Sequence, residues 1–179
     1  MNQPVPASAD AREQLRALYD AHLRDVWYAL RRLGVPSRDL EDACHEVFLV
    51  AHRRLDVFDH DRPARPWLCG IAWRVAAAWR RRAGARLVSV GIERDVLAEG
   101  PDASRQLEAR DAADLVQRAL EVLPEAQRDV FVLHELDGLS MPEIAELTSV
   151  PLNTLYSRLR LGRARFAAEA IRLRDGGGA

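Results

Sequence analysis

Hydrophobic residues recur every three or four positions along almost the whole chain, and this periodicity restricts the fold more than any other sequence feature. Between residues 10 and 33 the repeat consists of Leu15, Leu18, His22, Val26, Ala29 and Leu33 and is apolar except at His22. Side chains at this spacing share one face of an α-helix, whereas a half-buried strand would show alternation. The same rhythm predicts further helices over residues 37–55, 66–83, 108–122, 125–136, 140–148 and 153–174. We therefore expect an all-α fold.

The helical pattern has one long interruption, between residues 85 and 107. Gly91, Gly100 and Pro101 fall there among mixed acidic residues, a composition typical of a linker. The sequence thus predicts two small helical domains, 10–84 and 108–175, joined by a flexible linker, 85–107.

Composition narrows the class of protein. No apolar run approaches the roughly 18 residues that span a bilayer, and the N-terminus lacks the pattern of a secretory signal, so we expect a cytoplasmic protein without direct membrane insertion. Cys44 and Cys69 each lie inside an apolar helical pattern and are predicted to be buried free thiols. There is no zinc-type spacing, glycine-rich phosphate loop or nucleophile elbow, so we expect no metal, no cofactor and no catalytic site.

The net charge of −1 conceals strong segregation of charge along the chain. Seven arginines and one aspartate give residues 61–90 a charge of +6, and six arginines and two acidic residues give residues 148–179 a charge of +4. Each basic segment follows a more acidic one, which suggests two contact points with a polyanion. Charge alone is equally compatible with two solvated basic helix faces. All 26 basic residues are arginine, whose planar fork suits phosphate and guanine.

The segment 136–165 has the pattern of a helix-turn-helix. Ser140 and Glu143 form a capping box that starts a short helix, and residues 148–152 form a turn. Asn153 or Thr154 is then expected to cap a longer helix with Leu155 and Leu159 facing inward. Such a second helix enters the major groove of DNA. An ordinary helical hairpin with a basic solvated face is the alternative, although the capping box and the placement of the arginines favour DNA.

The same segment resembles the C-terminal promoter-reading domain of extracytoplasmic-function (ECF) sigma factors. The matching residues are Leu123-Pro124, Gln127-Arg128, Phe131-Val132-Leu133, Gly138-Leu139-Ser140, Glu143-Ile144-Ala145, Thr154-Leu155, Ser157-Arg158-Leu159 and Arg163. Tyr156 and Leu161 occupy positions that are often basic in the family. The resemblance implies that the second helix reads the upstream (minus-35) promoter element through Asn153, Thr154, Tyr156, Ser157, Arg158, Arg160 and Arg163.

A second match lies in the N-terminal half. The run from Asp42 to Phe48 resembles the family segment that docks on the clamp helices of RNA polymerase, with His45 at a position usually held by glutamine. Helical geometry places Asp42, His45 and Glu46 on one face with Leu49 alongside. The expected polymerase-binding residues are Asp42, His45, Glu46, Phe48 and Leu49, with Phe48 or Leu49 exposed beside the acidic face. A solvated acidic face is the alternative.

The basic segment after residue 60 resembles the family helix that holds the melted downstream (minus-10) element. Trp67-Leu68, Ile71-Ala72, Arg74 and Arg80-Arg81-Arg82 carry this match, and single-stranded DNA requires stacking surfaces and a cationic track. Trp73 is the better stacking candidate, whereas Trp67 is expected to pack in the core. The loop 55–66 corresponds to the family loop that captures a flipped base. The expected single-strand contacts are His60, Arg62, Arg65, Trp73, Arg74, Arg80 and Arg81.

The resemblance covers about residues 12–172. It implies a transcription initiation factor whose partners are core RNA polymerase, promoter DNA and a dedicated anti-sigma factor. The alternative is a helix-turn-helix regulator with an N-terminal sensing or dimerisation domain, which would need neither the Asp42–Phe48 face nor the basic stretch 74–86. The linker reaches across the two promoter elements only when it is extended, so we expect the free chain to be compact or variable.

Overall fold

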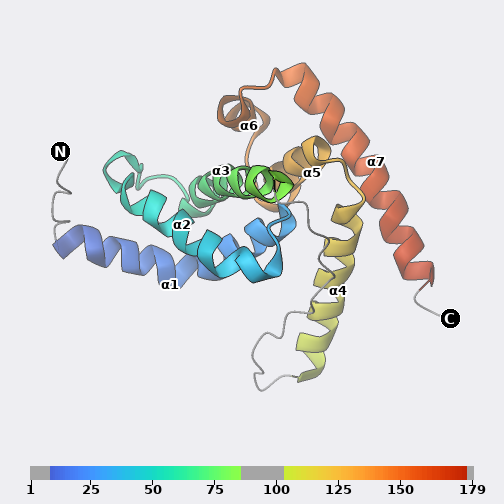
Figure 1. Cartoon of the computed structure of the whole chain (residues 1–179), viewed down its shortest axis with the longest axis horizontal. Helices are drawn as coiled ribbons and strands as arrows, with labels where there is room; N and C mark the ends of the chain where they lie inside the picture. The colour runs from blue at the N-terminus through green and yellow to red at the C-terminus, as the bar shows by residue number, and fades with distance from the viewer. Residues whose placement is uncertain (1–8, 86–102, 177–179) are drawn as a thin grey trace.

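The computed structural model describes residues 9–85 and 103–176 (Figure 1). The α-helices are α1 (Ala9–Arg32), α2 (Leu40–His52), α3 (Ala64–Ala85), α4 (Ala103–Glu121), α5 (Glu125–Phe131), α6 (Met141–Thr148) and α7 (Leu152–Gly176). Short 3-10 turns, η1 (Ser37–Asp39) and η2 (Leu55–Val57), flank α2, and a π-helix, η3 (Val132–Leu136), continues α5. The described ranges contain no strand, and the predicted all-α fold is confirmed.

Most predicted helix limits lie within a few residues of the observed ones. Helix α4 begins at Ala103, five residues before the predicted start. Residues 86–102 of the predicted linker lie outside the described residues. Helix α7 begins at Leu152, so Asn153 and Thr154 lie in its first turn and neither caps it. The Pro151 carbonyl accepts hydrogen bonds from the backbone N–H groups of Thr154 and Leu155 (3.0 and 3.1 Å). These bonds start the helix one residue earlier in the sequence than predicted.

The N-terminal half is a three-helix unit in which α1, α2 and α3 pack on one another. Val26, Ala29 and Leu33 are fully buried, as the periodicity predicts. The chain turns after α1 at Gly34, whose φ of +87° favours glycine. A Cβ atom there would lie 2.8 Å from a guanidinium nitrogen of Arg128, so the turn also accommodates a side chain from the second half.

The C-terminal half is built around the contact between α5 and α7. A Cβ atom on Gly162 would lie 3.4 Å from the backbone oxygen of Gln127, so the absence of a side chain lets the two helices approach. Further along the same contact, the rings of Phe131 and Phe166 stack with their centroids 4.7 Å apart.

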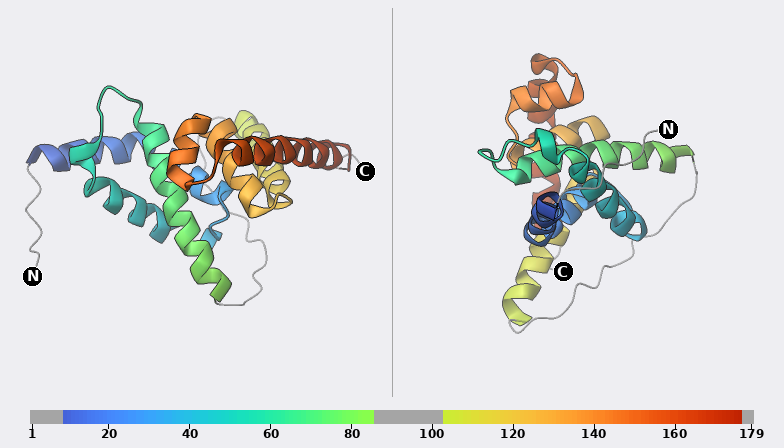
Figure 2. Two further views of the ribbon diagram at one scale, coloured as in Figure 1. Left: turned by 90° about the horizontal axis from the view of Figure 1, so that it is seen from above. Right: turned by 90° about the vertical axis from the view of Figure 1, so that its left-hand side faces the viewer.

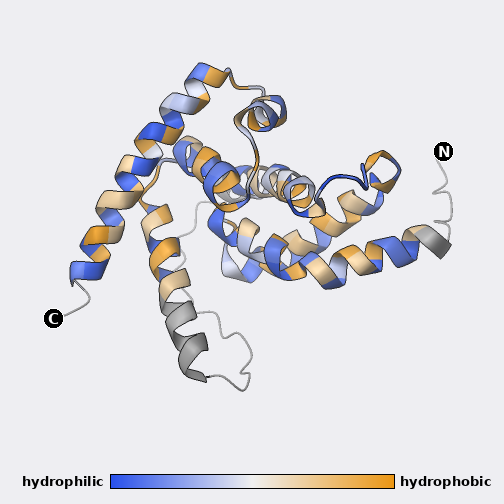
Figure 3. Ribbon diagram, turned by 180° about the vertical axis from the view of Figure 1, so that it is seen from behind, coloured by the Kyte–Doolittle hydropathy of each residue, from blue (hydrophilic) through white to orange (hydrophobic). Residues whose placement is uncertain are grey.

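The two halves pack against each other, and their buried residues form one continuous hydrophobic cluster. Helix α3 lies between the α1–α2 pair and α6, whereas α4 lies directly against α1 (Figure 2). A Cβ atom on Gly70 of α3 would lie 3.8 Å from the methyl groups of Leu147 on α6, so the space between the two helices there is about the size of one methyl group. Most close packing nevertheless lies within each half rather than between them. Hydrophilic and hydrophobic bands alternate along α1 and α7, as expected for amphipathic helices (Figure 3).

Cys44 and Cys69 are buried and free, as predicted. Burial raises the pKa of the Cys44 thiol to about 11 and raises that of Cys69 further, so both thiols are protonated and unreactive near neutral pH. None of the described helices is both long and apolar enough to cross a membrane.

Candidate nucleic-acid interface

Helices α6 and α7 form the predicted helix-turn-helix. The Ser140 hydroxyl accepts a hydrogen bond from the Glu143 backbone N–H (3.4 Å), and the Glu143 carboxylate accepts one from the Ser140 backbone N–H (2.9 Å). The predicted capping box is therefore confirmed. Helix α6 ends at Thr148, its C-cap Ser149 adopts a left-handed conformation with φ 57°, and α7 starts at Leu152. This tight turn fixes the angle at which α7 leaves the domain.

The first turns of α7 present a polar face outside the domain. Leu155 and Leu159 are buried beneath it, which orients the opposite face outward. Tyr156 is 55% exposed. Arg158 is half-buried, and the exposed positions of the predicted upstream site are Asn153, Thr154, Tyr156, Ser157, Arg160 and Arg163.

Arg163 differs from the other members of this set because an acidic side chain already holds it. Its guanidinium donates to the carboxylate of Glu135 on η3 at 2.8 and 2.5 Å. This ion pair links the middle of α7 to the end of η3, so Arg163 also has a role in positioning the helix.

The acidic face of α2 forms largely as predicted. Asp42, His45 and Leu49 are exposed, with Leu49 at 44%. Glu46 is half-buried because its carboxylate accepts a hydrogen bond from Trp79 Nε1 (2.9 Å) and lies 3.6 Å from Arg82. Asp42, His45 and Leu49 on this face are therefore open to a partner, whereas the second acidic group, Glu46, is tied to α3.

Of the two apolar residues expected beside this face, Leu49 is exposed and Phe48 is not. Phe48 is only 5% exposed, and its ring packs against Tyr19 of α1 with centroids 4.8 Å apart. Helical spacing places Leu49 alongside Asp42, His45 and Glu46, whereas Phe48 belongs to the inner stripe of α2. Phe48 therefore supports the exposed face from below.

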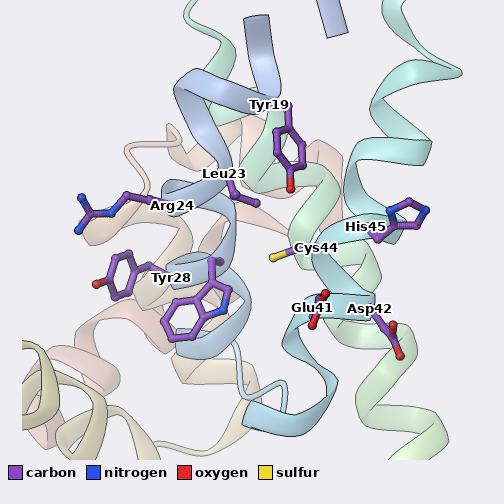
Figure 4. A pocket seen from close by; sticks show the side chains of 9 residues that line it. Tyr19, Leu23, Arg24, Tyr28, Glu41, Asp42, Cys44 and His45 are labelled. Carbon is purple, nitrogen blue, oxygen red and sulfur yellow. The ribbon is translucent and has the colours of Figure 1, made fainter. Parts of the chain in front are cut away.

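A hollow of about 600 Å³ lies next to this face, between α1 and α2. Tyr19, Leu23, Arg24, Trp27 and Tyr28 line it from α1, and Glu41, Asp42, Cys44 and His45 line it from α2 (Figure 4). Its floor is apolar and aromatic, and its α2 rim is acidic. Such a hollow can accept an apolar side chain flanked by basic groups.

The predicted single-strand residues fall into two groups. His60, Arg74 and Arg81 are exposed. The other four contact the C-terminal half: Arg62 pairs with Glu143, Arg65 donates to the Leu136 carbonyl (2.7 Å), and Trp73 and Arg80 donate to Asp129. Trp67 packs against Phe58 with ring centroids 4.5 Å apart and is half-buried, as expected for a core-side tryptophan.

Asp129 on α5 is the centre of the most extensive of these contacts. Its Oδ2 atom accepts hydrogen bonds from Trp73 Nε1 (2.7 Å) and from an Arg80 guanidinium nitrogen (2.8 Å). Arg80 also donates to Glu125 (3.1 Å) and to the Leu33 carbonyl (2.5 Å), and its side chain is only 10% exposed. Burial raises the pKa of Asp129, while the Arg80 charge and the two hydrogen bonds oppose this shift.

Asp137, at the end of η3, is a second buried carboxylate between the halves. It is 1% exposed and lies 3.9 Å from Arg32 and 3.8 Å from Arg65. Neither of its oxygens has a nitrogen or oxygen hydrogen-bond donor among the described residues, and the Cys69 thiol is the weak donor beside it. Burial raises the pKa of Asp137 to about 6, against the lowering effect of the two arginines.

Sequence reasoning identified the arginines and Trp73 but missed these carboxylates. Asp129 stands directly before the apolar run Val130–Leu133, and Asp137 follows Leu136. A carboxylate in the buried stripe of a helix is a signal that a basic partner lies opposite. That signal was present in the sequence, but it does not reveal which arginine supplies the charge.

The fold and this surface define a helix-turn-helix DNA-binding protein with a separate helical N-terminal half. Two family models match the chain: Sigma-70 region 2 over residues 18–86 and Sigma-70 region 4 over residues 113–166. The ECF RNA polymerase sigma-E factor of Escherichia coli is 33% identical over 134 residues, which cover 70% of each chain. The RNA polymerase sigma factor CnrH of Cupriavidus metallidurans is 30% identical over 148 residues, 78% of each chain.

Solved structures agree with these matches. The structure of CnrH in complex with the cytosolic domain of CnrY is similar with a TM-score of 0.58 and 26% identity, over 89% of this chain and 92% of that one. The sigma factor RpoE of Bartonella quintana, in complex with the anti-sigma factor NepR, has the same fold with a TM-score of 0.66 and 16% identity, over 88% and 96% of the two chains. The chain belongs to the ECF class of the sigma-70 family. It is an RNA polymerase sigma factor that directs transcription initiation to promoters.

Proposed function

We propose that the chain binds core RNA polymerase through the outer face of α2 and the adjoining hollow, and promoter DNA through α7 and α3. The observation that carries this proposal is the presence of both sigma-70 regions, in order, on one chain. In this assignment residues 10–84 form the polymerase-docking and minus-10 domain, 85–107 the linker and 108–175 the minus-35 domain. The chain acts by binding rather than by catalysis, in the cytoplasm with its polymerase.

For polymerase docking we assign the surface of Asp42, His45 and Leu49, with Glu46 at its edge and Phe48 beneath. Carboxylates beside an apolar hollow are complementary to a basic helical partner. The regulator alternative is not favoured, because its N-terminal half would sense a ligand or dimerise, whereas this half matches Sigma-70 region 2. The RpoE and NepR complex supports an anti-sigma factor as a further partner of this chain.

Charge reversal tests the docking surface. Asp42→Arg should abolish co-purification with core polymerase, whereas Asp175→Arg, at an exposed position near the end of α7, should not. Glu46 is unsuitable for this test because it also holds Trp79. Equal retention of polymerase by both variants, with unchanged helical content, would contradict the assignment.

For the minus-35 element we assign the first turns of α7: Asn153, Thr154, Tyr156, Ser157, Arg158 and Arg160, with Arg163 at the limit of the site. If Arg158 reads a base, Arg158→Ala should cost about 1–3 kcal/mol of binding and relax preference at one upstream position. If it holds a phosphate, all sequences should weaken alike. Arg165→Ala, further along the exposed side of α7, is the matched control. Transcription in vitro with core polymerase on variant promoters measures both effects.

For the melted minus-10 strand we assign His60, Arg62, Arg65, Trp73, Arg74, Arg80 and Arg81. Arg74 and Arg81 are the appropriate pair to replace, because both are exposed while Arg80 is held by Asp129. The double alanine variant should form closed complexes normally but open them slowly, as measured by permanganate reactivity of unpaired thymines. A pre-melted template should rescue this variant more than it rescues Arg158→Ala. If pre-melting rescued neither variant, the separate assignment of α3 and α7 would be incorrect.

A further inference from the structure

The C-terminal half occupies much of the surface that we assign to the melted strand. Arg62, Arg65, Trp73 and Arg80 each donate a hydrogen bond to a group from residues 125–143, and Arg80 also donates to the Leu33 carbonyl in its own half. His60, Arg74 and Arg81 are exposed, and Arg62 also keeps 64% of its side chain exposed beside Glu143. The occupied groups include the stacking candidate and the most buried arginine, so the closed chain presents an incomplete single-strand site.

The acceptors in this contact have the chemistry of a phosphate. The Asp129 carboxylate carries a negative charge and accepts two hydrogen bonds through one oxygen, from Trp73 Nε1 and Arg80. Glu125 adds a second carboxylate to the same guanidinium (3.1 Å). A DNA phosphate would offer the same arginine the same kind of oxygen acceptor. The strand and Asp129 therefore compete for one set of donors.

The charged character of the contact between the two halves also favours their separation. Arginine–carboxylate pairs between the halves extend from the buried Asp129 and Asp137 to the exposed Asp114, which pairs with Arg31 at 3.0 Å. Interfaces this rich in charge resemble those between domains that move rather than permanent ones. Asp137 has no nitrogen or oxygen donor in the described residues, so burial of its charge favours separation.

We propose that the chain inhibits itself in this way: Asp129, with Glu125, holds Arg80 and Trp73 in place of the promoter strand until the halves separate. The inference rests on the proposed minus-10 role of α3. The α2 docking residues Asp42, His45 and Leu49 are exposed in this closed form. Polymerase therefore docks on the closed chain first, and separation of the halves then exposes the single-strand site.

Replacement of the central carboxylate is the first test. In the full chain without polymerase, Asp129→Asn should bind a labelled single-stranded minus-10 oligonucleotide at least about tenfold more tightly than the natural chain, because affinity scales with the fraction of open molecules. Asp114→Asn removes the same charge from an exposed pair between the halves and should change affinity less than about twofold. Fluorescence anisotropy measures both values.

Shape provides a readout that does not depend on DNA. A compact chain of this length has a radius of gyration of about 16 Å, and two halves of about 80 residues with centres about 40 Å apart would give about 23 Å. Small-angle scattering should show an increase for Asp129→Asn and none for Asp114→Asn. An Asp129→Asn chain that expands without binding the oligonucleotide more tightly would overturn the proposal, as would one that stays compact with unchanged affinity.

A cross-link tests the proposal even if Asp129→Asn does not fold. Arg31→Cys and Asp114→Cys, at a pair outside both proposed DNA sites, can be joined by a short, cleavable bismaleimide, while the buried Cys44 and Cys69 react slowly. The locked chain should bind core polymerase but yield no open promoter complexes, and cleavage of the linker should restore them. Open-complex formation by the locked chain would overturn self-inhibition. A cleaved chain that also fails would instead contradict the proposed function.

Discussion

The buried carboxylate of Asp137 makes the stability of the closed chain depend on pH in a defined direction. Its pKa is raised to about 6 by burial between the halves, with Arg32 and Arg65 opposing the shift and Asp25 adding to it. In the unfolded chain the same carboxyl has its ordinary pKa of 3.8. The closed form therefore binds the proton more tightly, so this group favours the closed form at low pH, and its contribution is lost as pH rises through about 6.

The magnitude follows from the two pKa values. A shift of about two units corresponds to about 3 kcal/mol between strongly acidic and neutral pH. Over the milder interval from pH 7.5 to 5.5 the stabilisation is about 1 kcal/mol, or roughly a fourfold change in the equilibrium constant. This effect is within the resolution of urea unfolding followed by tryptophan fluorescence.

The assay compares the natural chain with Asp137→Asn, which cannot titrate at this position. The natural chain should gain about 1 kcal/mol relative to the variant when pH falls from 7.5 to 5.5. Asp129 is present in both chains, so its own raised pKa cancels in the comparison. Asp175→Asn, an exposed replacement with the same charge change, should follow the natural chain. Parallel pH dependence of the natural chain and Asp137→Asn would refute the reasoning.

Three further substitutions test the local geometry by thermal unfolding. Gly34→Ala should destabilise the chain by about 1–2 kcal/mol or more, because φ is +87° and the new Cβ meets Arg128; no loss would contradict both causes. Ser140→Ala should cost the C-terminal half about 1 kcal/mol through loss of its cap, and an unchanged midpoint would mean that water replaces the capping bonds. Gly162→Val should cost about 1–3 kcal/mol by separating α5 from α7, whereas Gly176→Val, which meets nothing within 4 Å, should not; equal effects would rule out the close approach.

The helices and the local motifs could be predicted from the amino-acid sequence. Every predicted helix exists, and the Ser140 capping box, the turn after α6 and the buried stripes of α1 and α7 follow from residues at most a few positions apart. The exposure of Asp42, His45 and Leu49, the proposed docking residues, also follows from helical spacing. These features are encoded locally because hydrophobic periodicity and capping act within one or two helical turns.

Which charged and aromatic side chains are paired or buried depends on the tertiary structure. Helical spacing could not tell that Phe48 lies beneath Tyr19, because the width of a buried stripe depends on the neighbouring helix. It could not pair Arg80 with Asp129, 49 positions away, or place Asp137 between Arg32 and Arg65. Such pairings depend on how two separately patterned halves dock. The free energy of a buried charge is set by whichever group the fold brings opposite to it, and the identity of that group is not written in the local sequence.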